Sequence, residues 1–262
     1  MGSEEQFKGS WKPFWAIMQT DLENLLKNKI TYIWLIIAIF IQIIRILMLN
    51  PFMRIGGAPL IITNGLSDFI YLWSMIIIGV SASAISSETG ELADSIMSKA
   101  VTRFNYVLAK FSSRIIYVLI TYAVITTALT GVTLRINNSG YETYGLISAI
   151  LYVALALIML TTVGVSLSIV IPNKIVSIIV LLVLWHSMNI FLPILDLTFL
   201  APTTIIDQLP DIIQGNSFPV TYIEWIGEGT WIGAEWKTIT GFAVISITAT
   251  ILSNIYFSIK DL

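Results

Sequence analysis

Apolar residues along this chain gather in six long runs that are separated by more polar stretches. Helices of about 20 apolar residues cross the roughly 30 Å hydrocarbon layer of a bilayer, and each run reaches that length. The pattern predicts an all-α integral membrane protein, with residues 1–262 forming a single transmembrane domain. The six expected spans are residues 30–49, 67–86, 107–132, 145–171, 174–194 and 238–258.

Residues 8–28 follow a different pattern, in which apolar side chains recur at helical spacing and charged ones fill the other positions. A tryptophan-rich apolar face opposite a charged face is typical of a helix in the plane of the membrane interface. A helix packed on a partner would show the same pattern, but the span that begins directly afterwards favours the interface. Glu23 and Lys27 lie four residues apart and predict a surface ion pair.

Composition agrees with the membrane interpretation. Apolar residues make up 56% of the chain and charged residues 11%, with a mean hydropathy of +0.85, whereas soluble domains are about 25% charged. No basic field suggests nucleic acid as a partner. The chain has no cysteine, which excludes disulfides and thiolate metal sites. Its first ten residues lack the pattern of a cleavable signal peptide.

The placement of Lys and Arg predicts the orientation, because cytoplasmic segments carry an excess of these residues. With the N-terminus inside, ten of the 14 basic residues are cytoplasmic. These ten are Lys8, Lys12, Lys27, Lys29, Lys99, Arg103, Lys110, Arg114, Lys174 and Lys260. We therefore expect a multi-pass plasma-membrane protein with both termini in the cytoplasm. The acidic 195–237 segment is then external, and Asn137 falls in an external glycosylation pattern.

The longest charged stretch between two apolar runs is residues 86–110. Its acids come first and its bases later, an order that offsets the helix dipole. Leu92 and Ile96 lie four residues apart, so one face of the expected helix is apolar. The stretch predicts a short amphipathic helix between the second and third spans, suited to contact a partner outside the bilayer. The alternative is a solvated face that contacts nothing.

The residues of this loop resemble those of a known family, the membrane subunits of type-2 ABC exporters (type V exporter-like). The matching residues are Ser87-Glu88, Gly90, Ile96, Ser98-Lys99-Ala100-Val101, Arg103 and Tyr106-Val107-Leu108-Ala109-Lys110. Ala100 stands where the family usually has proline, and Ala109 where it usually has glycine. The layout of an amphipathic start, six spans and a long segment before the last span is similar to that of the family.

The resemblance implies a role for each segment. Residues 8–28 would be the elbow helix, residues 87–105 a cytoplasmic coupling loop, and residues 195–237 short external helices before the last span. A coupling helix would dock on a nucleotide-binding ABC ATPase subunit, which would bind ATP and Mg²⁺. A second copy of the chain or a homologous permease would complete the membrane core. The docking residues would be Glu88, Glu91, Leu92, Ile96, Lys99 and Arg103.

The chain itself contains no Gly-Lys pair, so it lacks the P-loop motif that holds nucleotide phosphates. We expect a transport subunit without a cofactor of its own rather than an enzyme. Its energy would come from a separate ATPase or from an ion gradient.

Polar residues inside the expected spans are few, and such residues are functional candidates because they are costly in a bilayer. The family resemblance places the second and fifth spans around the substrate path, which makes Ser74, Ser81, His186 and Asn189 candidate path residues. Hydrogen bonding between helices would equally explain them. Near the outer ends of the first two spans, Arg45 is expected to reach the headgroups. Asp68 is expected to be a solvated acid at a helix start.

The residues thus predict the permease subunit of an ATP-driven exporter. An ion-driven carrier is a second hypothesis. Such carriers usually have acidic or basic residues near the middle of a span, and no acid lies at the middle of an expected span here, which argues against this hypothesis. A purely structural membrane subunit is a third. An intramembrane enzyme is disfavoured, because one histidine cannot supply a metalloprotease site. Ser81 also lacks the strained, glycine-flanked setting expected of a nucleophile.

Overall fold

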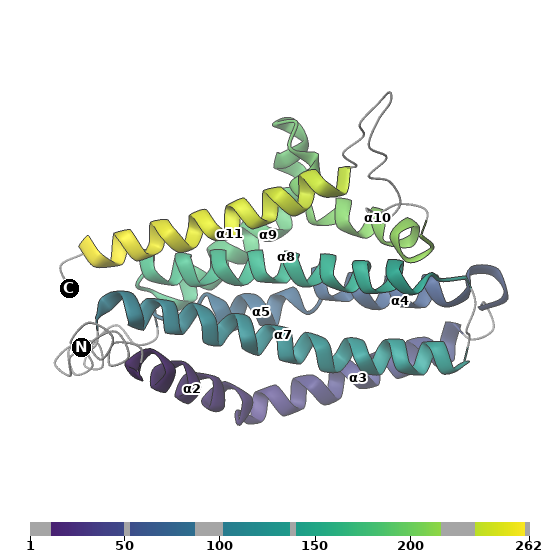
Figure 1. Cartoon of the computed structure of the whole chain (residues 1–262), viewed down its shortest axis with the longest axis horizontal. Helices are drawn as coiled ribbons and strands as arrows, with labels where there is room; N and C mark the ends of the chain where they lie inside the picture. The colour runs from purple at the N-terminus through teal and green to yellow at the C-terminus, as the bar shows by residue number, and fades with distance from the viewer. Residues whose placement is uncertain (1–11, 50–52, 87–101, 137–139, 216–233, 260–262) are drawn as a thin grey trace, which may run out of the picture.

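The computed structural model describes residues 12–49, 53–86, 102–136, 140–215 and 234–259, and these residues form helices joined by short turns (Figure 1). The helices are α2 (Lys12–Leu26), α3 (Lys29–Leu49), α4 (Met53–Tyr71), α5 (Ser74–Ser81), α7 (Arg103–Ile136), α8 (Thr143–Val170), α9 (Lys174–Ile194), the 3-10 turn η2 (Thr198–Leu200), α10 (Pro202–Ile213) and α11 (Ala234–Ile259).

Within the described ranges, six spans are long and apolar enough to cross a membrane, which confirms the number predicted from sequence. They are Lys29–Met48, Gly57–Ser81, Arg103–Ile136, Thr143–Val170, Lys174–Ile194 and Trp236–Phe257. Successive spans run in opposite directions along the bundle, so α2 begins and α11 finishes at the same end (Figure 1). We call this end, where α5 finishes and α7 begins, the junction end. The opposite end is called the α10 end.

The second span departs from its expected bounds of 67–86. It runs over Gly57–Ser81 and consists of α4 followed by α5. Thr63, Asn64 and Asp68 lower the hydropathy of its first half, which is why the sequence pattern placed the start too late. Most of this span is buried inside the bundle, where neighbouring helices rather than lipid surround such polar side chains.

The third span is longer than expected. The sequence pattern predicted a span over residues 107–132, whereas α7, which forms this span, has 34 residues. At 1.5 Å per residue the helix is about 50 Å long, well beyond the hydrocarbon thickness. Thr102 caps its start, since the Asn105 backbone N–H donates to the Thr102 hydroxyl at 3.3 Å. The additional first turns carry polar residues at the junction end.

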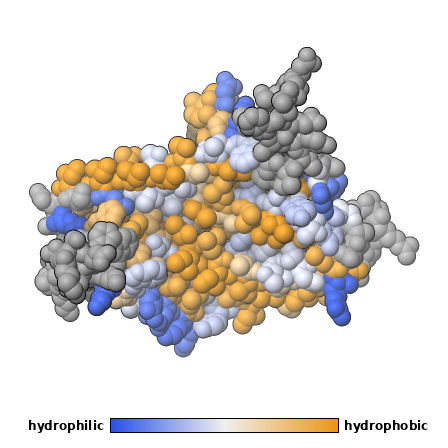
Figure 2. Space-filling model, viewed as in Figure 1, coloured by the Kyte–Doolittle hydropathy of each residue, from blue (hydrophilic) through white to orange (hydrophobic). Residues whose placement is uncertain are grey.

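Helix α8 lies at the centre of the bundle (Figure 1). Its Ala149, Val153, Ala156 and Leu157 are fully buried in the main core. By contrast, α9 and α11 leave most of their apolar side chains uncovered. Figure 2 shows hydrophobic surface along α11 and across the middle of the bundle, with hydrophilic residues towards the two ends. This distribution suits helices whose outer faces contact lipid.

Two predicted peripheral features are also present. The prediction of short helices before the last span is confirmed for η2 and α10, and residues 216–233 lie outside the described part. Helix α10 buries Ile205, Leu209, Ile212 and Ile213, which belong to the same core as the buried face of α8. Its acids Asp207 and Asp211 are exposed. This helix therefore packs its apolar face against the bundle and leaves its acidic face uncovered.

Helix α2 lies alongside the first turns of α7 (Figure 1). Its Phe14 and Met18 are buried in a cluster with Ala109 of α7, while Trp15 is exposed. The apolar face expected at the membrane interface is thus partly covered by the chain's own third span. The predicted Glu23–Lys27 ion pair is confirmed, with 2.8 Å between Nζ and Oε2.

Candidate functional site

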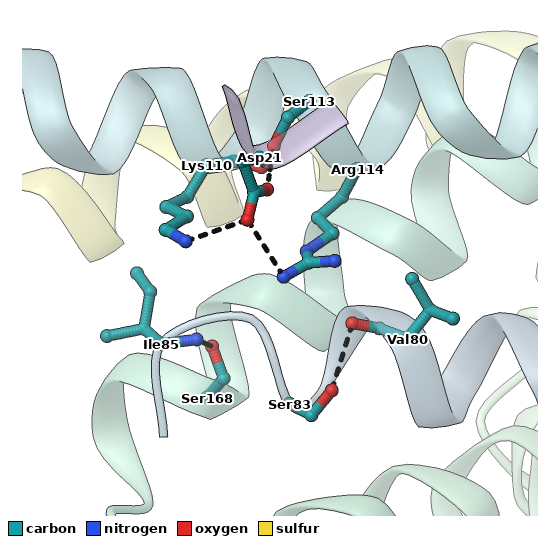
Figure 3. Close-up of polar contacts among 8 residues, drawn as sticks. All are labelled: Asp21, Val80, Ser83, Ile85, Lys110, Ser113, Arg114 and Ser168. Atoms are coloured by element: carbon teal, nitrogen blue, oxygen red, sulfur yellow. Dashed lines mark hydrogen bonds and ion pairs between the residues drawn. The ribbon is translucent and has the colours of Figure 1, made fainter. Parts of the chain in front are cut away.

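The junction end brings together α2, the turn at residues 82–86, the start of α7 and the end of α8 (Figures 1 and 3). The predicted coupling residues Glu88, Glu91, Leu92, Ile96 and Lys99 belong to residues 87–101, which lie outside the described part. Arg103, the sixth, is the first residue of α7. The described residues therefore define the two points from which the predicted coupling segment leaves and returns.

A polar cluster joins α2 to α7 at this end. Asp21 of α2 accepts hydrogen bonds from Lys110 Nζ at 2.9 Å and from Ser113 Oγ at 2.5 Å. The Nη2 atom of Arg114 lies 3.4 Å from the same carboxylate. Figure 3 shows Lys110 and Arg114 extending from α7 on either side of Asp21, towards the turn that carries Ser83 and Ile85.

All three charged side chains of this cluster are largely buried. Their exposed fractions are 12% for Asp21, 5% for Lys110 and 8% for Arg114. The Asp21 carboxylate thus pairs with two buried cations, and its removal would take a negative charge away from both of them in a medium of low dielectric constant. The cluster is therefore a strong, directional connection between α2 and the leading turns of α7.

Opposing influences set the pKa of Asp21. Burial raises it, but Arg114, Lys110 and the hydrogen bonds from Ser113 and Lys110 together hold the pKa of this carboxyl below its ordinary value of 3.8. The stabilising contribution of the ionised form is present above the ordinary pKa and is lost only as the pH falls through the lower pKa of the folded state.

We expect the contact between α2 and α7 to be unchanged from pH 8 to pH 5 and to weaken only below the ordinary pKa of 3.8. Nitroxide labels at Trp15→Cys and Phe104→Cys, both exposed positions, would report the distance between the helices by electron paramagnetic resonance. In an Asp21→Asn background the low-pH change should vanish. A change between pH 8 and pH 5 would contradict the assigned role of Asp21.

The other side of residues 87–101 is anchored to α8. The Ile85 backbone N–H donates to Ser168 Oγ of α8 at 3.3 Å (Figure 3), and Ser86 Oγ donates to the Ala82 carbonyl. Helices α5 and α8 approach closely, because a Cβ at Gly164 would collide with the Ser81 side chain. The segment thus departs from a point fixed on α8 and returns to one fixed on α2 and α7.

The predicted path residues bond to separate partners. Ser74 and Ser81 are fully buried and donate to carbonyls of their own span, Tyr71 and Ile77 respectively. His186 Nδ1 lies 3.1 Å from the Leu182 carbonyl oxygen. Asn189 Oδ1 accepts from the backbone and hydroxyl of Thr203, which joins α9 to α10. Interhelical hydrogen bonding, the alternative interpretation, therefore describes Asn189, and a substrate role for the four remains a prediction.

Two expectations about the outer charges were wrong. Asp68 is not a solvated acid at a helix start, since it lies near the middle of Gly57–Ser81. Arg45 turns towards Asp68 and forms an ion pair with 2.7 Å between Nη1 and Oδ2. Side chains on a helix tilt towards its N-terminus, and α3 begins at the junction end, so Arg45 reaches into the span instead of out of it.

Sequence reasoning also missed the partners of Asp21. One signal was present: Lys110, Ser113 and Arg114 lie on one face of a helix at the start of an apolar span, where two buried cations require an acid. Nothing local identified Asp21, which is 89 residues away from Lys110. Among the described residues no group of three or more His, Cys, Asp or Glu side chains could hold a metal ion.

The fold and its six spans define a multi-pass helical membrane protein. A scan against protein-family models finds no family that matches the chain, and a search of curated proteins finds no matching relative.

Proposed function

We propose that this protein is the permease subunit of an ATP-driven exporter of the type-2 ABC class, in which separate ATPase subunits act on residues 87–101. The residue pattern of this loop supports the class, and the six antiparallel spans agree with it. Both termini and the loop would face the cytoplasm of a plasma-membrane protein. ATP and Mg²⁺ would bind in the ATPase, and a second permease copy or homologue would complete the path.

One observation carries the proposal: residues 87–101 are bounded by two anchors on different helices. Ile85 is bonded to Ser168 of α8, whereas α7 is bonded through Lys110 to Asp21 of α2. A partner that moves this segment would therefore act on the central helix and on the α2–α7 pair together. ATP can drive transport only if the ATPase binds one permease state more tightly than the other, and such anchors would transmit that preference.

The ion-driven carrier stays a second candidate because of one specific observation. Asp68 lies inside a span, and intramembrane acids are common in proton and cation pathways. However, both oxygens of Asp68 are engaged by Arg45, so the carboxylate is already neutralised. This arrangement favours a structural contact over an ion-coupling site.

A single cysteine at Ser95 tests the proposal, because the natural chain contains none. Expressed with its native neighbours and crosslinked, this variant should capture an ATPase that carries a Walker motif. A cysteine at the exposed Asp211 of α10, at the opposite end, should not. If the purified chain instead moves solute without ATP and without a crosslinked partner, the exporter proposal fails and the carrier is favoured.

A further inference from the structure

The half of the second span nearer the α10 end is bounded by two interruptions. At its start Gly57 has φ 62° and ψ −164°, a left-handed backbone conformation that suits glycine, and Pro59 follows within the same helix. At its other end the backbone N–H groups of Leu72 and Trp73 both donate to the Asp68 carbonyl at 2.8 Å. The bond from Trp73 spans five residues, as in a π-bulge. Residues 58–71 are thus a helical segment between two breaks.

Side chains compensate the backbone at the second break. The Trp185 indole N–H of α9 donates to the Ile70 carbonyl at 2.9 Å, and Ser74 Oγ donates to the Tyr71 carbonyl at 3.0 Å. Interruptions inside a membrane-spanning helix are stable only if freed polar groups find such partners. Because these donors come from side chains, the break can persist while residues 58–71 change direction.

A bidentate ion pair ties this segment to α3. Arg45 Nη1 lies 2.7 Å from Asp68 Oδ2, and Arg45 Nη2 donates to Asp68 Oδ1 at 2.9 Å. Gln42 Nε2 adds a third bond to Oδ2 at 3.0 Å. The side chains of Arg45 and Asp68 are 23% and 15% exposed. Fork-shaped pairs of this kind fix orientation as well as distance.

Stability alone does not explain a charged pair at this place. Well-packed apolar residues can replace a buried ion pair without loss of stability, whereas the removal of one partner is strongly unfavourable. Lipid-like surroundings accentuate this difference, because an unpaired charge in a span is costly. The Arg45–Asp68 ion pair therefore has two distinct states. In the closed state the two charges neutralise each other, and in the open state each charge needs water or another partner.

We propose that residues 58–71 are a gate segment that turns about Gly57 and the Leu72–Trp73 break, and that the Arg45–Asp68 ion pair is the latch that holds it against α3. Its use in moving a substrate rests on the transport function proposed above. The movement itself does not, because hinges and latch all belong to this chain and can be measured without an ATPase.

The test measures the distance between α3 and the gate segment in the purified full-length chain in nanodiscs. Nitroxide labels at Leu47→Cys and Leu60→Cys occupy exposed positions on the two elements. With the latch intact we expect one narrow distance. The neutral double variant Arg45→Met/Asp68→Leu should at least triple the fraction of molecules at a second, longer distance.

Two controls distinguish release of the latch from a general loosening of the helix bundle. Labels at Leu47→Cys and Val132→Cys, on α3 and α7, should keep their distance in the double variant. The exchanged pair Arg45→Asp/Asp68→Arg should restore the narrow distance, because Arg at position 68 would tilt towards the start of α4 and reach position 45. An unchanged Leu47–Leu60 distance in the neutral variant, or equal changes at both label pairs, would overturn the proposal whatever the outcome of the ATPase experiment.

Discussion

Replacement of Asp21 by asparagine is expected to release α2 from the start of α7. The variant removes the carboxylate that pairs with the buried Lys110 and Arg114. The loss of one partner from a buried ion pair costs about 3–5 kcal/mol. Because α2 is a peripheral helix, this cost should appear as local opening before global unfolding. Backbone amides of α2 should then exchange hydrogen about a hundredfold to several thousandfold faster, since about 1.4 kcal/mol corresponds to a factor of ten.

Glu23→Gln provides a matched control on the same helix. Glu23 is an acid paired with a lysine, as Asp21 is, but its pair with Lys27 is exposed. Surface pairs contribute little because water and salt screen them, so exchange in α2 should be unchanged. Equal exchange rates in Asp21→Asn and Glu23→Gln would show that the buried cluster does not hold α2 in place.

Substitution of Gly145 by alanine should separate α10 from α8. A Cβ at Gly145 would lie far inside contact distance of the Ile212 carbonyl oxygen and 3.0 Å from that of Ile213. Both obstacles are backbone atoms of α10, which cannot move aside as a flexible side chain can. Overpacking of this kind costs about 1–3 kcal/mol. We expect a lower unfolding free energy in mixed detergent micelles and faster hydrogen exchange in α10.

The same substitution at Gly131 should have the opposite sign. Nothing lies within 4 Å of a Cβ at this position of α7, and alanine is favoured over glycine in a helix interior by about 0.5–1 kcal/mol. Gly131→Ala should therefore stabilise the chain slightly. A loss of stability at both positions, or at neither, would contradict the close approach of α8 and α10.

Local patterns predicted those features that depend on solvent preference. Each apolar run became a span because a helix in lipid needs only length and hydrophobicity, and α2 formed where apolar residues recur at helical spacing. The second span was located least well. Neighbouring helices cover Asp68 and the polar residues beside it wholly or in part, whereas a hydropathy pattern treats such residues as facing water. The start of α7 was missed for a related reason: its polar first turns are covered by α2.

By itself, the sequence determined that the chain is an all-helical membrane protein with six spans and an amphipathic helix at its start. These properties follow from the order of apolar and polar residues over windows of about 20 positions. The tertiary structure alone decided which charges that are distant in the sequence meet. Lys110 pairs with Asp21 across 89 residues and Arg45 with Asp68 across 23, because packing of helices brings distant side chains together and burial then requires each charge to find a partner.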